Sequence, residues 1–451
     1  MSYQKNDVLT VKIEDMGHDG EGIGKCEGYT LFVKDTVIGD LAEVKVIKAK
    51  KNYGYARLMR LIEPSPHRVE PICPVARPCG GCQLQMLDYA EQLRFKEKKI
   101  AQNLQRIGGM TEIPMEPIVG MESPFRYRNK AQFPIGVDKE GNLIAGFYAG
   151  RTHQIIPVPN RDCVLGVPEN KVILDQILDY MREEKISAYD EERHKGLVRH
   201  VLVRYGFTTK EIMVCLIING DKLPCSEKLL EKLTKIPGMT SITYNINKEK
   251  TNVIMGSKVC PLWGQTYITD YIGNVKYQIS PLSFYQVNPV QTEILYNKAI
   301  TYAGLTGKEK VIDAYCGTGT IGLIAASQAK EVIGVEIVEE AVTAAKENAE
   351  ANGLTNCSFL AGDVLKVIDE IEEKPDFIVL DPPREGIHPK ALPKIVDLYR
   401  CEKMLYISCK PTSLARDLVE FAKYGYRVEK VCCVDTVSYT HLRAHETLMN
   451  L

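Results

Sequence analysis

The stretch VIDAYCGTGTIG at residues 311–322 decides the fold class of this chain. Its apolar start is typical of a buried strand, and Gly317, Gly319 and Gly322 follow with the spacing G-x-G-x-x-G. Glycines at this spacing let a ligand approach the backbone where a strand turns into a helix. Glu336, at the end of the next apolar run, is placed to hold ribose hydroxyls. The pattern predicts a nucleotide site.

Regular alternation of strands and helices surrounds this turn. Short apolar runs recur at 332–336, 377–380 and 404–408, and helical patterns such as 338–352 lie between them. This alternation predicts an α/β fold with a doubly wound, Rossmann-like parallel sheet.

A loop at the expected ligand-facing edge of this sheet bears on the choice of cofactor. The glycine spacing alone serves a dinucleotide and S-adenosylmethionine equally well. Asp381 follows an apolar run, and Pro382 and Pro383 after it stiffen the loop because proline fixes its own backbone angle. A rigid acidic loop here suits a cofactor or a planar base, and it tips the choice toward S-adenosylmethionine. The alternative interpretation is a simple turn that ends a strand.

A cysteine ends another strand on the same edge. Cys409 follows the apolar run 404–408, and Lys410 next to it would favour the thiolate, the reactive form of the side chain. On its own, a strand-end cysteine beside a lysine is more often structural. Together with the glycine turn and Asp381, Cys409 becomes a candidate nucleophile.

The first 62 residues predict a small antiparallel barrel with an RNA-binding face. Short strand patterns are separated by Gly, Asp and Asn, and the loop 17–24 holds too many glycines for a helix. Between Glu43 and Glu63 six lysines and arginines occur without an acidic residue, interleaved with Tyr53 and Tyr55. The pattern fits a phosphate track with stacking aromatic rings, and equally a solvated strand face.

A cysteine-rich loop follows a proline-rich linker at residues 64–66. Cys73, Cys79 and Cys82 lie in CPVARPCGGC, and Cys163 is the isolated candidate for a fourth ligand. Zinc and an iron–sulfur cluster both accept four thiolates, so the spacing predicts a metal site without choosing the metal. The alternative is a set of packed free cysteines.

The composition narrows the setting in which these sites work. Lys and Arg total 57 against 58 Asp and Glu, a net charge of −1, so nucleic acid can bind only on a local basic patch. No run of 18 apolar residues occurs, which predicts no membrane span. The polar start, residues 1–10, lacks the apolar stretch of a signal peptide, and the 14 cysteines fit a reducing compartment. We therefore expect a cytoplasmic protein.

These motifs together resemble the RNA uracil-5-methyltransferases that use S-adenosylmethionine. The likeness is greatest to the 23S ribosomal RNA branch, which has an N-terminal TRAM domain and a [4Fe-4S] cluster. It covers residues 1 to about 435. Its most specific parts are the four cysteines, FYQVN at 284–288, DAYCG at 313–317, DPPR at 381–384 and SCKP at 408–411.

The resemblance implies a role for each of these positions. The implied cofactor-binding residues are Gln286, Tyr315, Gly317, Glu336, Asp363 and Asp381. The implied ligands of the [4Fe-4S] cluster are Cys73, Cys79, Cys82 and Cys163. Cys409 becomes the nucleophile that adds to C6 of a flipped-out uracil, so that C5 can take up a methyl group. The implied partner is RNA, 23S ribosomal RNA in particular, and not DNA.

The same likeness divides the chain into parts with separate tasks. It implies a TRAM-like, OB-like barrel that binds RNA (1–62), a cluster loop (63–90) and a basic helix packed on the catalytic domain (91–124). A central α+β domain follows (125–265), with one helix near 168–185 and the fourth cluster cysteine. The methyltransferase domain comes last (266–435).

The ending departs from the family pattern. The family's proton-abstracting glutamate lies in a segment shaped like VDMFPHTxHVE, and here Ala444 stands at its place. Residues 438–447 look like translated library-adapter sequence, so we expect 436–451 to be a non-native ending that lacks the last strand and leaves a frayed sheet edge. Glu446, two residues late, or His445 would be the substitute general base.

Three other functions stay open at this stage. One is methylation of uracil C5 in transfer RNA instead of ribosomal RNA. Another is RNA binding by a catalytically impaired protein, because the glutamate is missing. The third is a dehydrogenase that uses the same glycine turn.

Overall fold

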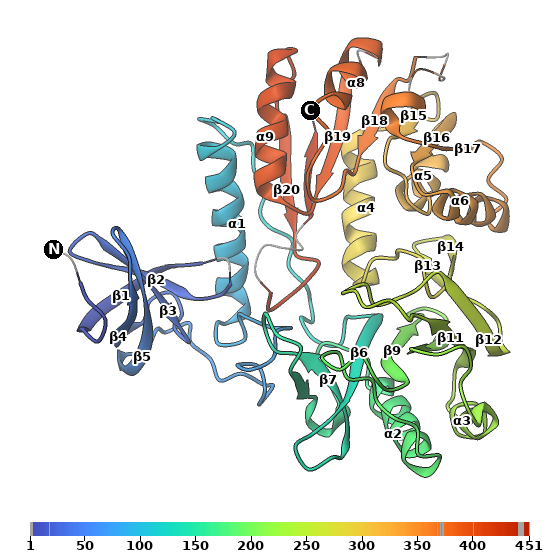
Figure 1. The fold of residues 1–451 in the computed structure, drawn as a ribbon. Helices are drawn as coiled ribbons and strands as arrows, with labels where there is room; N and C mark the ends of the chain where they lie inside the picture. The colour runs from blue at the N-terminus through green and yellow to red at the C-terminus, as the bar shows by residue number, and fades with distance from the viewer. Residues whose placement is uncertain are drawn as a thin grey trace.

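The computed structural model describes residues 3–17, 19–367, 369, 371, 374–399, 401–440 and 446–450. A barrel, a long helix, a mixed sheet and a second, mostly parallel sheet follow one another along the chain (Figure 1).

The N-terminal part is a closed barrel with the strand order β1-β2-β3-β5-β4, as predicted. Its strands are β1 (Val8–Met16), β2 (Gly22–Cys26), β3 (Tyr29–Lys34), β4 (Leu41–Ala49) and β5 (Tyr53–Glu63). Alternate side chains such as Leu31, Val33 and Val44 form its apolar core. Strand β2 was not predicted, because its glycines are typical of a loop. They are needed here since a β-carbon on Gly24 would lie 2.3 Å from the carbonyl oxygen of Lys12.

Helix α1 (Tyr89–Arg106) stands between the barrel and the C-terminal sheet (Figure 1). Asp88 caps it by accepting a hydrogen bond from the backbone N–H of Glu91 at 2.8 Å. Ile100 and Leu104 pack into the core of the C-terminal domain, and Lys99 reaches Asp15 of the barrel at 2.6 Å. The helix therefore joins two parts of the molecule.

The central part is a seven-stranded sheet with the order β12-β11-β10-β9-β6-β7-β8. Its strands are β6 (Lys130–Val137), β7 (Leu143–Tyr148), β8 (Ile155–Pro157), β9 (Val198–Tyr205), β10 (Ile212–Ile218), β11 (Met239–Ile246) and β12 (Lys258–Gly264). Helices α2 (Glu169–Glu183) and α3 (Ser226–Leu233) pack their apolar side chains into one core with these strands, and a short turn of 3-10 helix, η1 (Pro159–Arg161), precedes α2. The α+β class agrees with expectation, but the expectation of one helix was wrong. The second helix, α3, has a recognisable signal in its sequence SEKLLEKL, whose Leu229 and Leu233 are buried.

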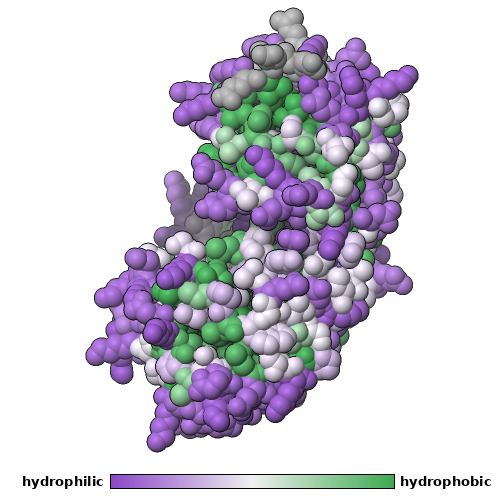
Figure 2. Space-filling view, turned by 90° about the vertical axis from the view of Figure 1, so that its right-hand side faces the viewer, coloured by the Kyte–Doolittle hydropathy of each residue, from purple (hydrophilic) through white to green (hydrophobic). Residues whose placement is uncertain are grey.

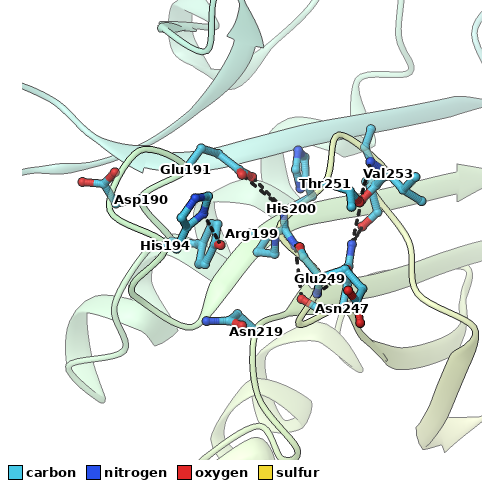
Figure 3. A network of polar contacts seen from close by, with 12 residues as sticks. Asp190, Glu191, His194, Arg199, His200, Asn219, Asn247, Glu249, Thr251 and Val253 are labelled. Atoms are coloured by element: carbon cyan, nitrogen blue, oxygen red, sulfur yellow. Dashed lines mark hydrogen bonds and ion pairs between the residues drawn. The ribbon is translucent and has the colours of Figure 1, made fainter.

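A buried arginine organises two loops of this central part (Figure 3). Arg199 donates two hydrogen bonds of 3.1 Å to the carboxylate of Glu191 and one of 2.8 Å to the carbonyl oxygen of Glu249. Its guanidinium lies 4.5 Å from the ring centre of Tyr189. These contacts fix the loop that follows β11.

The C-terminal sheet has the order β17-β16-β15-β18-β19-β21-β20. Its strands are β15 (Lys310–Asp313), β16 (Glu331–Glu336), β17 (Cys357–Ala361), β18 (Phe377–Leu380), β19 (Lys403–Ser408), β20 (Lys430–Val434) and β21 (Glu446–Asn450). Its helices are α4 (Pro289–Ala303), α5 (Thr320–Ala326), α6 (Glu339–Ala351), α7 (Val364–Val367), α8 (Ala391–Tyr399) and α9 (Pro411–Lys423), and a hairpin of β13 (Ile268–Ile272) and β14 (Val275–Ile279) precedes them. The five strands from β17 to β19 are parallel, which confirms the doubly wound sheet. The strand order reverses between β15 and β18, where such sheets form a ligand crevice.

The expectation of a frayed sheet edge without a last strand was wrong. Strand β21 lies between β19 and β20 and pairs antiparallel with both. The sequence ETLMN is a weak strand signal. Strand β21 forms because the backbone N–H and C=O groups of the two neighbouring strands are available for pairing. Local strand propensity contains no information about such neighbours.

The surface seen in Figure 2 is largely hydrophilic, and its hydrophobic residues gather in separate areas of the upper and lower halves. Within the described part of the chain, no helix combines the length and the apolar character needed to cross a bilayer.

Candidate active site

One large cavity, about 1230 Å³ in volume, lies where the C-terminal sheet meets the segments before and after it. It is lined by Gln286, Tyr315, Gly317, Glu336, Asp363, Asp381 and Cys409. The structure thus brings every cofactor residue implied by the resemblance, and the candidate nucleophile, to a single cavity. Residues far apart in sequence meet here because parallel strands place their carboxyl ends at one edge.

The glycine turn has a backbone that other residues adopt with difficulty. Gly319 has φ +81°, and a β-carbon there would come within 3.1 Å of Phe359 and Ala345. Glu336 accepts hydrogen bonds from the backbone N–H of Gly317 at 3.0 Å and of Val338 at 2.9 Å. The carboxylate is therefore held at the mouth of the turn, where ribose hydroxyls bind in such folds.

Asp313 is a site residue that the sequence reasoning did not single out. It lines the cavity at the end of β15 and is 1% exposed. One carboxyl oxygen accepts a hydrogen bond of 3.1 Å from Gly322, and the other is buried without a partner in the described structure. Burial, reinforced by the charge of Glu336, raises the pKa of this carboxyl to about 7. An acidic residue directly before a glycine turn was the available signal.

The loop that carries Asp381 is braced by α9. The buried carboxylate of Asp417 accepts hydrogen bonds from the backbone N–H of Ile387 at 2.8 Å and from the hydroxyl of Tyr406 at 2.7 Å. Ser413 donates to the carbonyl oxygen of Arg384 at 2.8 Å. These bonds fix the loop from its far end, while Pro382 and Pro383 stiffen its start, so Asp381 is held in place.

Cys409 lies between the end of β19 and the first residue of α9, and its side chain is half-buried. Ser408 and Lys410 hold the turn through two reciprocal hydrogen bonds of 3.1 Å. The N-terminus of a helix favours a thiolate through the helix dipole. Lys410, expected to favour the thiolate, does not line the cavity, and Cys409 lies just before the N-terminus of α9.

Two segments outside the sheet also contribute to the cavity wall. Asn288 caps α4 and donates a hydrogen bond of 3.1 Å to the carbonyl oxygen of Thr436. Thr436 and Val437 line the same cavity as Cys409. The ring of Phe284 also lines the cavity and is 71% exposed, so it is available for stacking.

The floor near β15 and β17 is formed by Tyr315 and Asp363. Burial raises the pKa of Tyr315 to about 12, with a contribution from the charges of Asp417 and Asp363, so the phenol is neutral at physiological pH. Asp363 accepts a hydrogen bond of 3.0 Å from the backbone N–H of Leu365 at the start of α7.

The four cysteines expected as metal ligands line a second cavity of about 370 Å³. They are Cys73, Cys79, Cys82 and Cys163, and Arg128 and Lys130 line it with them. Burial, together with the neighbouring thiols Cys163 and Cys79, raises the pKa of Cys82 to about 12. Across the residues that the structure describes, no three His, Cys, Asp or Glu side chains are arranged to hold one metal ion. The thiols share a cavity without forming a single-ion site.

The positions expected to carry the general base have no described side chain. Ala444 and His445 lie outside the described residues. The backbone of Glu446 begins β21, opposite Val434, and its side chain is not among those described.

Two domain families match parts of the chain. Residues 305–416 match the methyltransferase domain family and residues 4–59 match the TRAM domain family. Fold, cavity and these matches define the class of the chain: an S-adenosylmethionine-dependent methyltransferase with an N-terminal TRAM barrel. The dehydrogenase alternative is thereby excluded.

Relatives that match nearly the whole chain give the family. The chain is 48% identical over 440 residues to an uncharacterized RNA methyltransferase of Halalkalibacterium halodurans, covering 97% of this chain and 95% of the relative. It is 46% identical over 442 residues to one from Clostridium tetani, with the same shares. The chain belongs to this family of RNA methyltransferases.

A solved structure is similar over the same length. It is the Pyrococcus abyssi tRNA (uracil-54, C5)-methyltransferase in complex with S-adenosyl-L-homocysteine. The TM-score is 0.78 and the identity 26%, covering 98% of this chain and 100% of that chain.

Proposed function

We propose that this protein methylates C5 of a specific uridine in structured RNA, 23S ribosomal RNA in the first place, in the cytoplasm. The observation that carries the proposal is the shared cavity: Cys409 and the six residues expected at the cofactor line the same space. Its volume of about 1230 Å³ leaves room for a base beside the cofactor.

A cysteine in this cavity can activate the uracil ring for methylation. C5 of uracil is too weak a nucleophile to take up a methyl group directly. The thiolate of Cys409 forms a bond to C6, and the ring becomes an enolate with electron density at C5. C5 then takes up the methyl group, a base removes the C5 proton, and the C6–S bond breaks to release Cys409 and the methylated base. The uracil has to leave the RNA stack to reach this sulfur.

The residues around the glycine turn would hold the cofactor. Bound S-adenosylmethionine would supply the methyl group as a sulfonium-linked electrophile. We assign the ribose hydroxyls to Glu336, the adenine neighbourhood to Asp363 and the remaining contacts to Gln286, Tyr315 and Asp381. The buried carboxyl of Asp313 faces the same cavity and offers a negative charge to a cationic ligand.

The test uses RNA that contains 5-fluorouridine. Fluorine cannot leave C5 as a cation, so the enzyme stays linked to the methylated base whether or not a general base is present. We expect the parent chain with S-adenosylmethionine to form this adduct, and Cys409→Ala to bind the RNA without forming it. Cys316→Ala is the matched control, since Cys316 also lines the cavity but burial holds its pKa far above the ordinary range. An adduct formed by Cys409→Ala, or lost in Cys316→Ala alone, contradicts the proposal.

Transfer RNA is the second candidate substrate, because the similar solved structure is a tRNA (uracil-54, C5)-methyltransferase. The TRAM barrel and the cysteine loop favour ribosomal RNA. Mass mapping of 5-methyluridine in 23S RNA and in transfer RNA from a deletion strain separates the two. A missing methyl group in transfer RNA alone would make transfer RNA the substrate.

We further propose a [4Fe-4S] cluster held by Cys73, Cys79, Cys82 and Cys163. The support is the donor set: four thiols line one cavity, and Arg128 and Lys130 beside them offset the negative charge of thiolate ligands. Analysis of iron, acid-labile sulfide and zinc in protein purified without oxygen is the measurement. We expect iron and sulfide in the parent, little of either in Cys79→Ser, and no change in Cys225→Ser, whose cysteine is exposed elsewhere. Zinc in place of iron contradicts the cluster.

A further inference from the structure

A segment without regular secondary structure, residues 435–440, follows β20 and forms part of the cavity wall through Thr436 and Val437. Its backbone belongs to no strand or helix, so its position depends on individual contacts. The backbone N–H of Asp435 donates to the carbonyl oxygen of Val119 at 2.9 Å, and Ser438 donates to that of Pro124 at 2.6 Å. Segments distant in sequence therefore fix this wall.

The contact of interest comes from α1. The side chains of Lys96 and Asp435 are both 0% exposed, and their N–O distance is 2.7 Å. The ammonium of Lys96 also donates a hydrogen bond of 3.0 Å to the carbonyl oxygen of Val437. Tyr89 lies in the same helix, and its hydroxyl donates a hydrogen bond of 2.8 Å to the other carboxyl oxygen of Asp435. One lysine thus holds both ends of the stretch that contributes Thr436 and Val437 to the cavity.

A fully buried ion pair adds little to the free energy of unfolding. Removing two charges from water costs more than many such pairs return, and apolar residues of similar size often replace them without loss. What a charged pair with fixed hydrogen bonds does supply is a single position for the groups it joins. Here those groups are the backbone atoms next to Thr436 and Val437, which line the same cavity as Cys409.

We propose that Lys96 is a positioning residue for methyl transfer, and that its contacts with Asp435 and Val437 hold the wall of the cavity against the target uracil. This inference rests on the proposed function. Lys96 does not line the cavity and touches neither substrate nor cofactor. It acts through residues 435–437, of which Thr436 and Val437 line the same cavity as Cys409.

The decisive variant removes both charges together. Lys96→Met with Asp435→Leu leaves no buried charge unpaired, and because leucine is larger than aspartate the melting temperature measures how the site accommodates it. Three quantities are measured on the full chain: melting temperature, affinity for S-adenosylhomocysteine, and the rate of adduct formation with 5-fluorouridine RNA at saturating RNA. We expect affinity within about twofold of the parent, and an adduct rate about 100-fold lower, as for a misplacement of about 1 Å.

The control is the other α1 ion pair, Lys99 with Asp15, which joins the helix to the barrel at 2.6 Å. Lys99→Met with Asp15→Leu is expected to keep the parent adduct rate at saturating RNA. A folded Lys96→Met/Asp435→Leu protein with the parent rate overturns the inference. Should that double variant fail to fold, Lys96→Met with Asp435→Asn takes its place, because asparagine keeps the shape of aspartate and no buried charge is left unpaired; equal losses of adduct rate and of S-adenosylhomocysteine affinity then overturn the inference too. Absence of any adduct in the parent chain is a failure of the proposed function instead.

Discussion

Asp313→Asn is expected to raise the free energy of unfolding of the ligand-free protein, and to raise it more at pH 7 than at pH 5. The carboxyl of Asp313 is buried, and its pKa is raised from 3.8 to about 7. Between these two values the unfolded chain is ionised while the folded protein keeps the proton, so the native state loses stability as pH rises. At about 1.4 kcal/mol for each pH unit, the full penalty above pH 7 is about 4 kcal/mol.

Urea denaturation of the parent and of Asp313→Asn, at half-unit steps from pH 5 to pH 8, measures this effect. Asparagine has nearly the same shape and still accepts the hydrogen bond of Gly322, but it does not ionise. The difference in unfolding free energy between the two proteins should grow by about 2 kcal/mol from pH 5 to pH 7 and level off by about pH 8. A difference that is independent of pH would refute the assignment of the shifted group to Asp313.

Ionisation of Asp313 should also affect cofactor binding. It lowers the stability of the ligand-free protein, but it should strengthen the binding of S-adenosylmethionine. S-adenosylmethionine carries positive charge at its sulfonium and amino groups, so it binds better to the ionised carboxyl. The affinity of the parent should rise with pH up to about 7, by up to about tenfold per unit, and then level off. Calorimetry on Asp313→Asn should show weaker binding without that rise.

Three further outcomes are expected. With its present ending, in which Ala444 stands at the place of the family's glutamate, the chain should accumulate methylated, Cys409-linked uridine RNA. Replacing residues 436–451 with a family-like ending should restore turnover, and equal turnover with either ending, by mass spectrometry, contradicts this. Tyr55→Ala, in the exposed aromatic cluster of the barrel, should weaken RNA binding by about 1–3 kcal/mol in filter binding, whereas Met59→Ala should not. Gly319→Val should abolish binding of S-adenosylhomocysteine in calorimetry, because a β-branched residue is strained at φ +81°.

The catalytic sheet and most of its cavity could be predicted from sequence because their signals are local. A strand, a glycine turn and a helix lie within residues 311–326, and Asp381 and Cys409 each follow an apolar run directly. Parallel strands then bring these positions together without any further information. The burial of Asp313 was not predictable in this way, since it depends on the neighbours of β15.

The parts that sequence could not supply depend on tertiary contacts. Lys96 and Asp435 are 339 positions apart, and a lysine in a basic helix gives no sign that it will be fully buried. Strand β21 forms because two neighbouring strands leave a place for it. In both cases tertiary packing decides what local preference does not.

The cavity consists of two halves with different origins. The methyltransferase domain match spans 305–416 and includes the glycine turn, Asp381 and Cys409. Val287, which lines both the large cavity and the cysteine cavity, lies outside it, and so does the 435–440 segment. Asn129 of the central part donates to the carbonyl oxygen of Gln286 at 2.9 Å, and Gln83 and Leu84 of the cysteine loop donate to that of Tyr439 at 2.8 and 3.0 Å. The methyltransferase domain thus carries the glycine turn, Asp381 and Cys409, while contacts from the N-terminal half of the chain hold Gln286 and Tyr439, which lie outside that domain match.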